Sequence, residues 1–375
     1  MPPPLKAQAP SSSCMFATMS ELLSLSSREL SVMPRCSSTT SLDQVSTLDL
    51  DRLSGVDPKP MPLPLEKLQA VKTIISHENC ADGTAAAMFL HDVLPDAKIR
   101  FVQYGDAQRN LQAEPGMLFC DFSPHPETFQ QFIDQGALIL DHHKGAQAIV
   151  EAFGESGVFG DEILDPGVCG AFLAYREVWF RLKHTVSVFG SEIARLAGVR
   201  DTWQRQDPTW DEACVLAEAM RFYPAESWLI ANPFAPENRE WWEARLATGR
   251  ILVERSAKSV QKAVDVAYRF TTSRGTRCVL FSGVRLSSDA AELVGKDADL
   301  VVGFDYYGIE KGQINLVFST RSHTDFDCLK LCKSQGGGGH TQAAGFSIKS
   351  DLETGNQDPY TVFEATLEWY EATLP

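Results

Sequence analysis

The segment Ala137-Leu138-Ile139-Leu140-Asp141-His142-His143 decides the fold, because a short apolar run ends in three residues of types that bind metals. Apolar runs of this length between turn residues are typical of buried strands in a parallel sheet. Two further runs follow the same pattern. Residues 71–76 lead to His77, and residues 117–120 lead to Asp121. The sequence therefore predicts a parallel sheet with polar residues at the ends of its strands.

These polar residues predict a metal site, because ligands of parallel sheets bind beyond the carboxyl ends of the strands. We expect one edge of the sheet to carry His77, Asp82, Asp121, His142 and His143. Carboxylates crowded together repel one another unless a cation neutralises them. A single Asp at a strand end is more often a helix N-cap. The combination instead indicates a pair of divalent metals that activates water for phosphate-ester hydrolysis.

Five motifs in a fixed order carry a family resemblance. They are His77-Glu78-Asn79-Cys80-Ala81-Asp82-Gly83, Cys120-Asp121-Phe122, Asp141-His142-His143, Val199-Arg200-Asp201-Thr202-Trp203, and Gly336-Gly337-Gly338-Gly339-His340 followed by Ala343-Ala344-Gly345. This order resembles the DHH phosphoesterase superfamily, with a DHH domain and a DHH-associated C-terminal domain, as in nanoRNase and RecJ-like phosphodiesterases. The resemblance covers roughly residues 70 to 350.

The resemblance implies a role for each motif residue. The implied metal ligands are His77, Asp82, Asp121, His142 and Asp201, and the implied catalytic residues are Asp121, Asp141, His142 and His143. Asp121 is expected to bridge two cations. His142 is expected to bind the second of them, and Asp201 to complete its ligand set. Carboxylate, imidazole and water ligands favour two manganese ions, with magnesium as the alternative.

Position 80 departs from the pattern, because many relatives have Asp where this chain has Cys80. Two interpretations stay open for this residue. It is either a thiolate ligand of the first metal or a small buried apolar residue.

The glycine run predicts a second functional segment. Consecutive glycines allow backbone N–H groups to approach an anion closely, which favours a phosphate-binding loop. By resemblance, the implied substrate-binding residues are His143, Arg321, Gly337, Gly338, Gly339 and His340. A further anion site is predicted at residues 167–171, where the N-terminus of a helix over residues 169–183 favours phosphate.

The pattern predicts four parts along the chain. Residues 1–64 form a disordered Ser- and Pro-rich extension, with an organelle transit peptide as the alternative. Residues 65–207 form the metal-binding catalytic domain, a doubly wound α/β domain with a parallel sheet. Residues 208–266 form a connector and a long linking helix. Residues 267–375 form a smaller α/β domain, and the resemblance implies that this domain binds the substrate.

Composition restricts the class of protein. The chain has 375 residues and a net charge of −15, which argues against a broad basic surface for long duplex nucleic acid. Its nine cysteines have no disulfide-dense spacing and predict reduced thiols, hence a cytoplasmic protein or an organellar one if the extension is a transit peptide. No apolar run approaches the ~18 residues of a membrane span. A homodimer interface lined by the aromatic residues between positions 203 and 242 remains an alternative.

The expected activity is a manganese-dependent phosphoesterase that hydrolyses short oligonucleotides or similar small phosphodiesters. Two alternatives remain from the sequence. One is an exopolyphosphatase or pyrophosphatase, which would need more basic side chains than this chain has in runs. The other is a nucleic-acid-binding protein that keeps the DHH fold without catalysis, against which the retained metal-ligand residues argue.

Overall fold

The computed structural model describes residues 63–310, 313–351 and 358–374, and these form two compact units. The first unit ends at Leu252 and the second begins at Val253, within a single long helix. The predicted extension lies outside the described residues except for Leu63 and Pro64. Leu63 is fully buried, and its carbonyl accepts a hydrogen bond from Arg181 (2.7 Å), so it is part of the folded unit.

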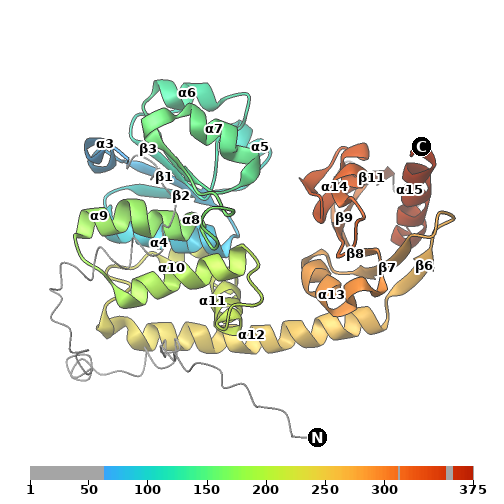
Figure 1. Cartoon of the computed structure of the whole chain (residues 1–375). Helices are drawn as coiled ribbons and strands as arrows, with labels where there is room; N and C mark the ends of the chain where they lie inside the picture. The colour runs from blue at the N-terminus through green and yellow to red at the C-terminus, as the bar shows by residue number, and fades with distance from the viewer. Residues whose placement is uncertain (1–62, 311–312, 352–357, 375) are drawn as a thin grey trace, which may run out of the picture. The chain divides into compact units, whose positions relative to one another are not determined.

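The first unit contains a five-stranded sheet and its helices (Figure 1). The strands are β1 (Thr73–His77), β2 (Lys98–Val102), β3 (Met117–Cys120), β4 (Leu138–Asp141) and β5 (Gly157–Phe159). The helices are α3 (Leu65–Gln69), α4 (Ala81–Val93), α5 (Asp106–Arg109), α6 (Phe129–Asp134), α7 (Gln147–Ala152), α8 (Gly170–Leu173), α9 (Phe180–Lys183), α10 (Val188–Asp201), α11 (Trp210–Phe222) and the first part of α12 (Arg239–Asp265). A π-helical segment, Ala174–Trp179, joins α8 to α9.

All neighbouring strands of this sheet run parallel, in the order β2-β1-β3-β4-β5. Successive side chains of a strand point to opposite faces, and both faces are buried. Ile74 packs with α4, α8 and α10 on one face, whereas Ile75 packs with α6 and α7 on the other. The doubly wound parallel fold predicted from the apolar runs is thus confirmed. Its parallel strands bring the ends of β1, β3 and β4 to one edge.

The second unit is a smaller α/β domain with a mixed sheet. Its strands are β6 (Tyr268–Thr271), β7 (Arg277–Ser282), β8 (Leu300–Glu310), β9 (Gln313–Arg321), β10 (Gly338–His340) and β11 (Ala343–Asp351), in the order β10-β11-β9-β8-β7-β6. Within the described part of this unit, β7 and β8 pair in parallel and the other neighbouring strands pair antiparallel. Helix α13 (Ser287–Val294) and the end of α12 cover one face, and α14 (Cys328–Ser334) and α15 (Pro359–Thr373) cover the other.

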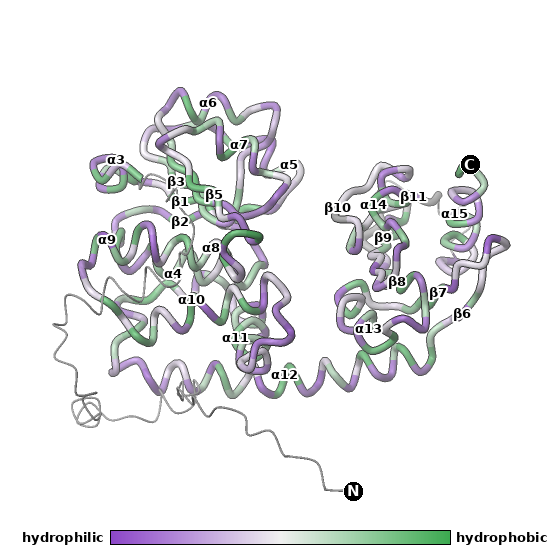
Figure 2. Tube along the Cα trace, in the orientation of Figure 1, coloured by the Kyte–Doolittle hydropathy of each residue, from purple (hydrophilic) through white to green (hydrophobic). Residues whose placement is uncertain are grey.

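Helix α12 begins in the first unit and ends in the second, and it corresponds to the linking helix predicted within residues 208–266. Hydrophilic and hydrophobic segments alternate along it (Figure 2), as expected for a helix with a buried face. Trp242 and Leu246 near its start are buried in the core of the first unit. Val260 and Val264 near its end are buried in the second. Among the described residues, no helix is long and apolar enough to cross a lipid bilayer.

Candidate metal centre

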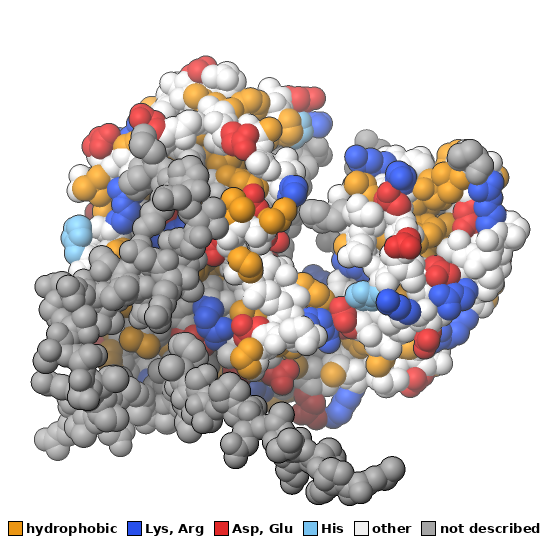
Figure 3. Space-filling model, in the orientation of Figure 1, with side chains coloured by type: hydrophobic (Ala, Val, Ile, Leu, Met, Phe, Trp, Pro, Cys, Tyr) orange, Lys and Arg blue, Asp and Glu red, His pale blue; other side chains and the backbone are white. Residues whose placement is uncertain are grey.

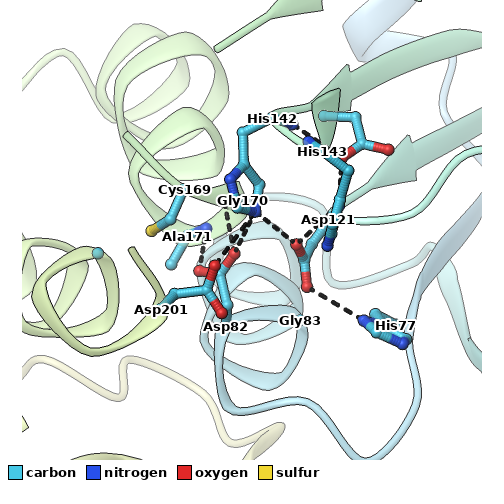
Figure 4. A network of polar contacts seen from close by, with 12 residues as sticks. His77, Asp82, Gly83, Asp121, His142, His143, Cys169, Gly170, Ala171 and Asp201 are labelled. Atoms are coloured by element: carbon cyan, nitrogen blue, oxygen red, sulfur yellow. Dashed lines mark hydrogen bonds and ion pairs between the residues drawn. The ribbon is translucent and has the colours of Figure 1, made fainter. Parts of the chain in front are cut away.

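The ligand-type residues predicted from the first four motifs meet at the carboxyl edge of the first sheet (Figure 4). Their side chains form three groups whose ligand atoms lie within 4.8 Å of one another. The groups are His77, Cys80 and Asp121; Asp82, His142 and Asp201; and Asp121, Asp141, His142 and His143. Asp121 and His142 each belong to two of these groups, so both lie at the centre of the cluster.

Asp121 directly follows β3 and is fully buried. Its φ of 56° lies in the left-handed region, which Asp and Asn tolerate better than most residues. Its N–H donates to Leu140 O (3.0 Å) in the neighbouring strand β4. Burial, together with the charge of Asp82, raises the pKa of Asp121 well above its usual range. The charged form of this carboxylate is therefore unfavourable unless a positive group faces it.

The orientation of His77 is fixed by Gln103. The Gln103 side chain donates from Nε2 to Glu78 O (3.2 Å), so its Oε1 accepts a hydrogen bond from His77 Nε2 (3.2 Å). This assignment leaves Nδ1 of a neutral ring without a proton. Burial lowers the pKa of His77, which favours that neutral ring.

Two acceptor atoms consequently face each other without a donor. His77 Nδ1 and Asp121 Oδ2 lie 3.8 Å apart, and both are buried without a hydrogen-bond partner. Unpartnered buried polar atoms are costly in a folded protein. A cation between two lone pairs removes this cost, so the residues present fit a divalent metal at this position.

His142 lies among three carboxylates. Its Nε2 is 3.3 Å from Asp121 Oδ1, 3.4 Å from Asp201 Oδ2 and 3.6 Å from Asp82 Oδ2. Its Nδ1 lies 3.2 Å from Glu162 Oε1. Burial alone lowers the pKa of His142, but Asp121 and Glu162 outweigh it and raise the pKa well above the usual value. The negative charge of these carboxylates can thus be balanced either by a proton on Nε2 or by a metal cation.

Glu162 was not identified from the sequence, because it lies in a loop that belongs to none of the motifs. Its carboxylate lies within hydrogen-bonding distance of the nitrogen of His142 that points away from the cluster. Such a partner orients a metal-binding imidazole and leaves its other nitrogen for the metal. Glu162 is therefore a positioning residue for His142.

Asp141 supports the imidazole of His143. Its Oδ1 accepts hydrogen bonds from the N–H groups of His142 (2.8 Å) and His143 (3.0 Å) and lies 2.7 Å from His143 Nδ1. Its Oδ2 accepts from Ser123 Oγ (2.5 Å). Burial raises the pKa of Asp141, but the hydrogen bonds from His143 and Ser123 more than offset burial and lower the pKa overall. These contacts allow Asp141 to orient the imidazole of His143.

Asp82 is held by a segment far away in the sequence. Its carboxylate accepts hydrogen bonds from the N–H groups of Gly170 (2.6 Å) and Ala171 (2.8 Å) at the start of α8. A Cβ at position 170 would lie 2.3 Å from Asp121 Cβ, so only glycine fits there. The predicted anion site at residues 167–171 is therefore wrong for a substrate phosphate. The helix N-terminus binds the chain's own carboxylate instead.

The pKa of His143 predicts how the metal-free protein responds to pH. Burial lowers this pKa, but the hydrogen bond to Asp141 and the charges of Asp141 and Asp121 raise it from 6.5 to about 9. Because the folded value is the higher one, this interaction stabilises fully below about pH 6.5 and is lost as the pH rises through about 9. We expect the thermal midpoint of chelator-treated protein to fall over this window, and to fall less in His143→Gln. Equal pH dependence in both proteins would contradict the assignment.

The remaining predicted residues lie in the second unit. Arg321 ends β9 and aligns with Ala343 of β11, which aligns with His340 of β10, so three strands form one row. Arg321 donates from Nε to Ser288 Oγ (2.9 Å) and from Nη1 to Thr320 O (2.8 Å). These hydrogen bonds hold the guanidinium in place, and its Nη2 has no hydrogen-bond partner among the described residues.

The glycine run differs from the predicted loop. Gly336 N and Gly337 N donate to the carbonyls of Lys333 and Cys332 at the end of α14 (3.1 and 2.8 Å). Gly338–His340 then form the edge strand β10. Gly339 has φ 136°, and a Cβ there would lie 2.5 Å from Ala343 O. Gly337 and Gly339 therefore allow the chain to lie close to β11, and the N–H of Gly337 already donates a hydrogen bond within the chain.

No protein-family model and no curated protein matches the chain. Solved structures similar to it include a pGpG-specific phosphodiesterase, PggH, from Vibrio cholerae, with 13% identity and a TM-score of 0.45, over 80% of this chain and 99% of that one. The DHH domain of a protein described as a member of a family of ribosomal proteins has 15% identity and a TM-score of 0.49, over 88% and 98% of the two chains. RecJ with Mg²⁺ from Thermus thermophilus has 15% identity and a TM-score of 0.45, over 87% and 55%.

The motifs stand in the expected order, and the fold places the first four of them at one edge of a parallel sheet. In its motifs, the chain resembles the DHH phosphoesterase superfamily.

Proposed function

We propose that the protein is a manganese-dependent phosphoesterase that hydrolyses short oligonucleotides or similar small phosphodiesters. The observation that carries this proposal is the pair of buried acceptor atoms, His77 Nδ1 and Asp121 Oδ2, at the centre of a cluster of carboxylates and imidazoles. In a cluster with only a structural role, each buried acceptor atom would be paired with a hydrogen-bond donor. A cluster that binds cations leaves them unpaired.

The residues divide into two metal positions that share Asp121. One position would be held by His77 and Asp121, with Cys80 nearby. The other would be held by Asp82, His142 and Asp201, and Asp121 Oδ1 lies 3.3 Å from the Nε2 of His142. Two divalent cations bound there would supply an activated water and neutralise charge on the phosphoryl group. Magnesium is the alternative to manganese, because oxygen and imidazole ligands suit both.

His143 is suited to contact the substrate phosphate. Its Nδ1 is hydrogen-bonded to Asp141, and 36% of its side chain is exposed. In the protein without metal, burial lowers the pKa of His143, but the hydrogen bond to Asp141 and the charges of Asp141 and Asp121 raise it to about 9, which favours a proton on both ring nitrogens. Its Nε2–H can then donate to a phosphoryl oxygen, while Asp141 keeps the ring oriented. This interaction would strengthen as charge builds up on the phosphoryl group.

A small substrate is favoured over long nucleic acid. The chain carries a net charge of −15, and acidic and basic side chains of the described residues are interspersed on the face shown in Figure 3. Binding of a long duplex depends on many Lys and Arg contacts with phosphates. A short oligonucleotide needs only a few, for which His143 and Arg321 are the candidates.

A substrate panel tests the function. Purified protein with added manganese is assayed on dinucleotides, longer oligonucleotides, cyclic dinucleotides, 3′-phosphoadenosine 5′-phosphate and polyphosphate. We expect the short linear oligonucleotides to be hydrolysed fastest. Faster release of phosphate from polyphosphate would favour the exopolyphosphatase alternative. Binding of oligonucleotides without hydrolysis of any substrate, at full metal content, would favour the non-catalytic one.

We propose that the second unit binds the substrate. Substitutions in this unit should therefore change the kinetics of hydrolysis without changing the amount of bound metal. We expect His340→Ala and Arg321→Ala to raise KM or lower kcat for nucleotides while bound metal stays unchanged. Arg321→Ala should affect substrates with an extra terminal phosphate more strongly, because a guanidinium pairs bidentately with phosphate.

Arg269→Ala is the matched control, because Arg269 is an exposed arginine on β6, at the opposite edge of the same sheet from β10. The measurement is metal content alongside kinetics for all three variants. Loss of metal in His340→Ala, or unchanged kinetics in both variants, would exclude the second unit as the substrate-binding part.

A further inference from the structure

Cys80 lies at the N-terminus of α4, beside residues of the metal cluster. It is the N-cap residue of α4, but its sulfur makes no capping hydrogen bond. Cysteine is not among the residues that favour this position, which are Ser, Thr, Asp and Asn. By contrast, Cys169 at the N-cap of α8 accepts a hydrogen bond from Phe172 N (3.4 Å). Helix capping therefore does not account for the cysteine at position 80.

The thiol of Cys80 lies among metal-ligand atoms. Its Sγ is within 4.8 Å of the ligand atoms of His77 and Asp121. Unlike most small apolar residues of the core, Cys80 is partly exposed. Its two neighbours present the buried acceptors Nδ1 and Oδ2, which have no hydrogen-bond partner. Asp121 is fully buried, so solvent does not satisfy its free oxygen. Three ligand types, nitrogen, sulfur and oxygen, thus surround one position.

We propose that Cys80 binds the first metal as a thiolate, and that the two metal positions differ in the ions they prefer. The proposal rests on the proposed function only in that the cluster binds cations. The position formed by His77, Cys80 and Asp121 offers the softer ligand set, and it favours a thiophilic divalent ion such as Zn²⁺, Fe²⁺ or Co²⁺. The position formed by Asp82, His142 and Asp201 has mostly oxygen ligands and favours Mn²⁺ or Mg²⁺.

Binding at the first position exchanges a proton for a metal. The S–H bond of Cys80 breaks, the sulfur–metal bond forms, and the proton goes to solvent. No electron is transferred. Among the described residues, two other thiols lie near the cluster, but both are buried and hydrogen-bonded to the backbone. Cys120 Sγ donates to Gly170 O (3.5 Å), and Cys169 Sγ accepts from Phe172 N. Cys80 is thus the thiol whose sulfur faces the metal position.

Cobalt provides a direct probe of the sulfur ligand. The full chain is freed of metal and titrated with Co²⁺ alone, and the near-ultraviolet absorption of a thiolate-to-cobalt charge transfer is recorded. We expect the wild type to show this band. Cys80→Ser and Cys80→Asp should lack it while still binding cobalt at the second position. Cys214→Ser is the matched control, because Cys214 is another partly exposed thiol of the same unit, and it should keep the band.

Metal competition measures the difference in preference. Wild-type protein, Cys80→Ser and Cys80→Asp are equilibrated with zinc and manganese together, and bound metals are counted. Replacing the thiolate by the carboxylate found in many relatives should lower the zinc-over-manganese preference of one site, on the order of tenfold. Circular dichroism checks that each variant is folded. Cys80→Ser, which adds no charge, keeps the test valid if Cys80→Asp fails to fold.

The outcomes separate this proposal from the proposed function. A wild type that binds two cobalt ions and hydrolyses phosphodiesters without a charge-transfer band would overturn the thiolate ligand and leave the function intact. Persistence of the band in both Cys80 variants, or its loss in Cys214→Ser, would also overturn it. A band that depends on Cys80 in a protein that hydrolyses no phosphoester would keep the ligand and reject the function.

Discussion

Replacement of Asp121 by Asn is expected to abolish activity while leaving the fold intact. A neutral amide cannot balance two cations, so both metals should bind more weakly. We expect the rate to fall by at least ~10²-fold, the upper end of what changes around metal ligands cause. The backbone should tolerate the change, because Asn is one of the few residues that accept the left-handed φ of 56° at this position.

The same substitution should not destabilise the protein without metal. The pKa of Asp121 is raised by burial and by Asp82, which means that its charge is unfavourable in the folded state. Removing the charge should leave the thermal midpoint of metal-free protein equal to or above that of the wild type. The rise in midpoint on adding manganese should shrink or disappear. Kinetics, metal content and thermal unfolding with and without manganese measure these effects.

Asp134→Asn is the control for this substitution, because Asp134 is an exposed carboxylate of the same unit at the end of α6. It should keep normal rates and a normal response to manganese. Near-normal activity with full metal content in Asp121→Asn would refute the assignment of Asp121 as the central ligand. A large fall in the midpoint of the metal-free variant would instead show a structural role.

Removal of metal should have an equally large effect on the wild type. Exhaustive chelation is expected to abolish hydrolysis, and added manganese should restore it better than calcium. Calcium prefers more oxygen ligands at longer distances in a looser arrangement, which suits a compact site with imidazole ligands poorly. The measurement is the rate of phosphodiester hydrolysis after chelation and dialysis, with each ion added back over a range of concentrations.

Chelation should also lower the thermal midpoint, because the carboxylates and acceptor atoms of the cluster then face one another without a cation. A protein whose rate survives chelation and dialysis does not use metals for catalysis. Equal restoration by calcium and manganese would mean that the site selects ions by charge alone. Either result would contradict the proposed mechanism.

Local sequence determined the sheet and the outline of the metal cluster. The apolar runs before His77, Asp121 and Asp141 form parallel strands, and parallel strands bring their carboxyl ends to one edge. The sequence also predicted a second, smaller α/β domain after a long linking helix. The structure has that domain, with a mixed sheet, and the linking helix α12 ends at Asp265. These features could be predicted because hydrophobic periodicity and strand direction are properties of short segments.

Tertiary structure decided how the cluster is held. The hydrogen bonds from the N–H groups of Gly170 and Ala171 to Asp82 join residues that are 88 and 89 positions apart. No local pattern in the sequence revealed that the N-terminus of α8 binds a carboxylate of the same chain. Glu162 lies in a loop without a motif, yet it lies against His142. The glycine run resembled a phosphate loop, but close approach to β11 makes it an edge strand.

The sequence by itself thus determined which residue types reach the edge of the sheet. Only the tertiary structure decided that Cys80 lies with His77 and Asp121 rather than with Asp82 and His142. The physical reason is that a strand pattern specifies the end at which a side chain lies. Its partners there depend on turns and helices that pack from distant parts of the chain, and on which buried atoms remain without a donor once that packing is complete.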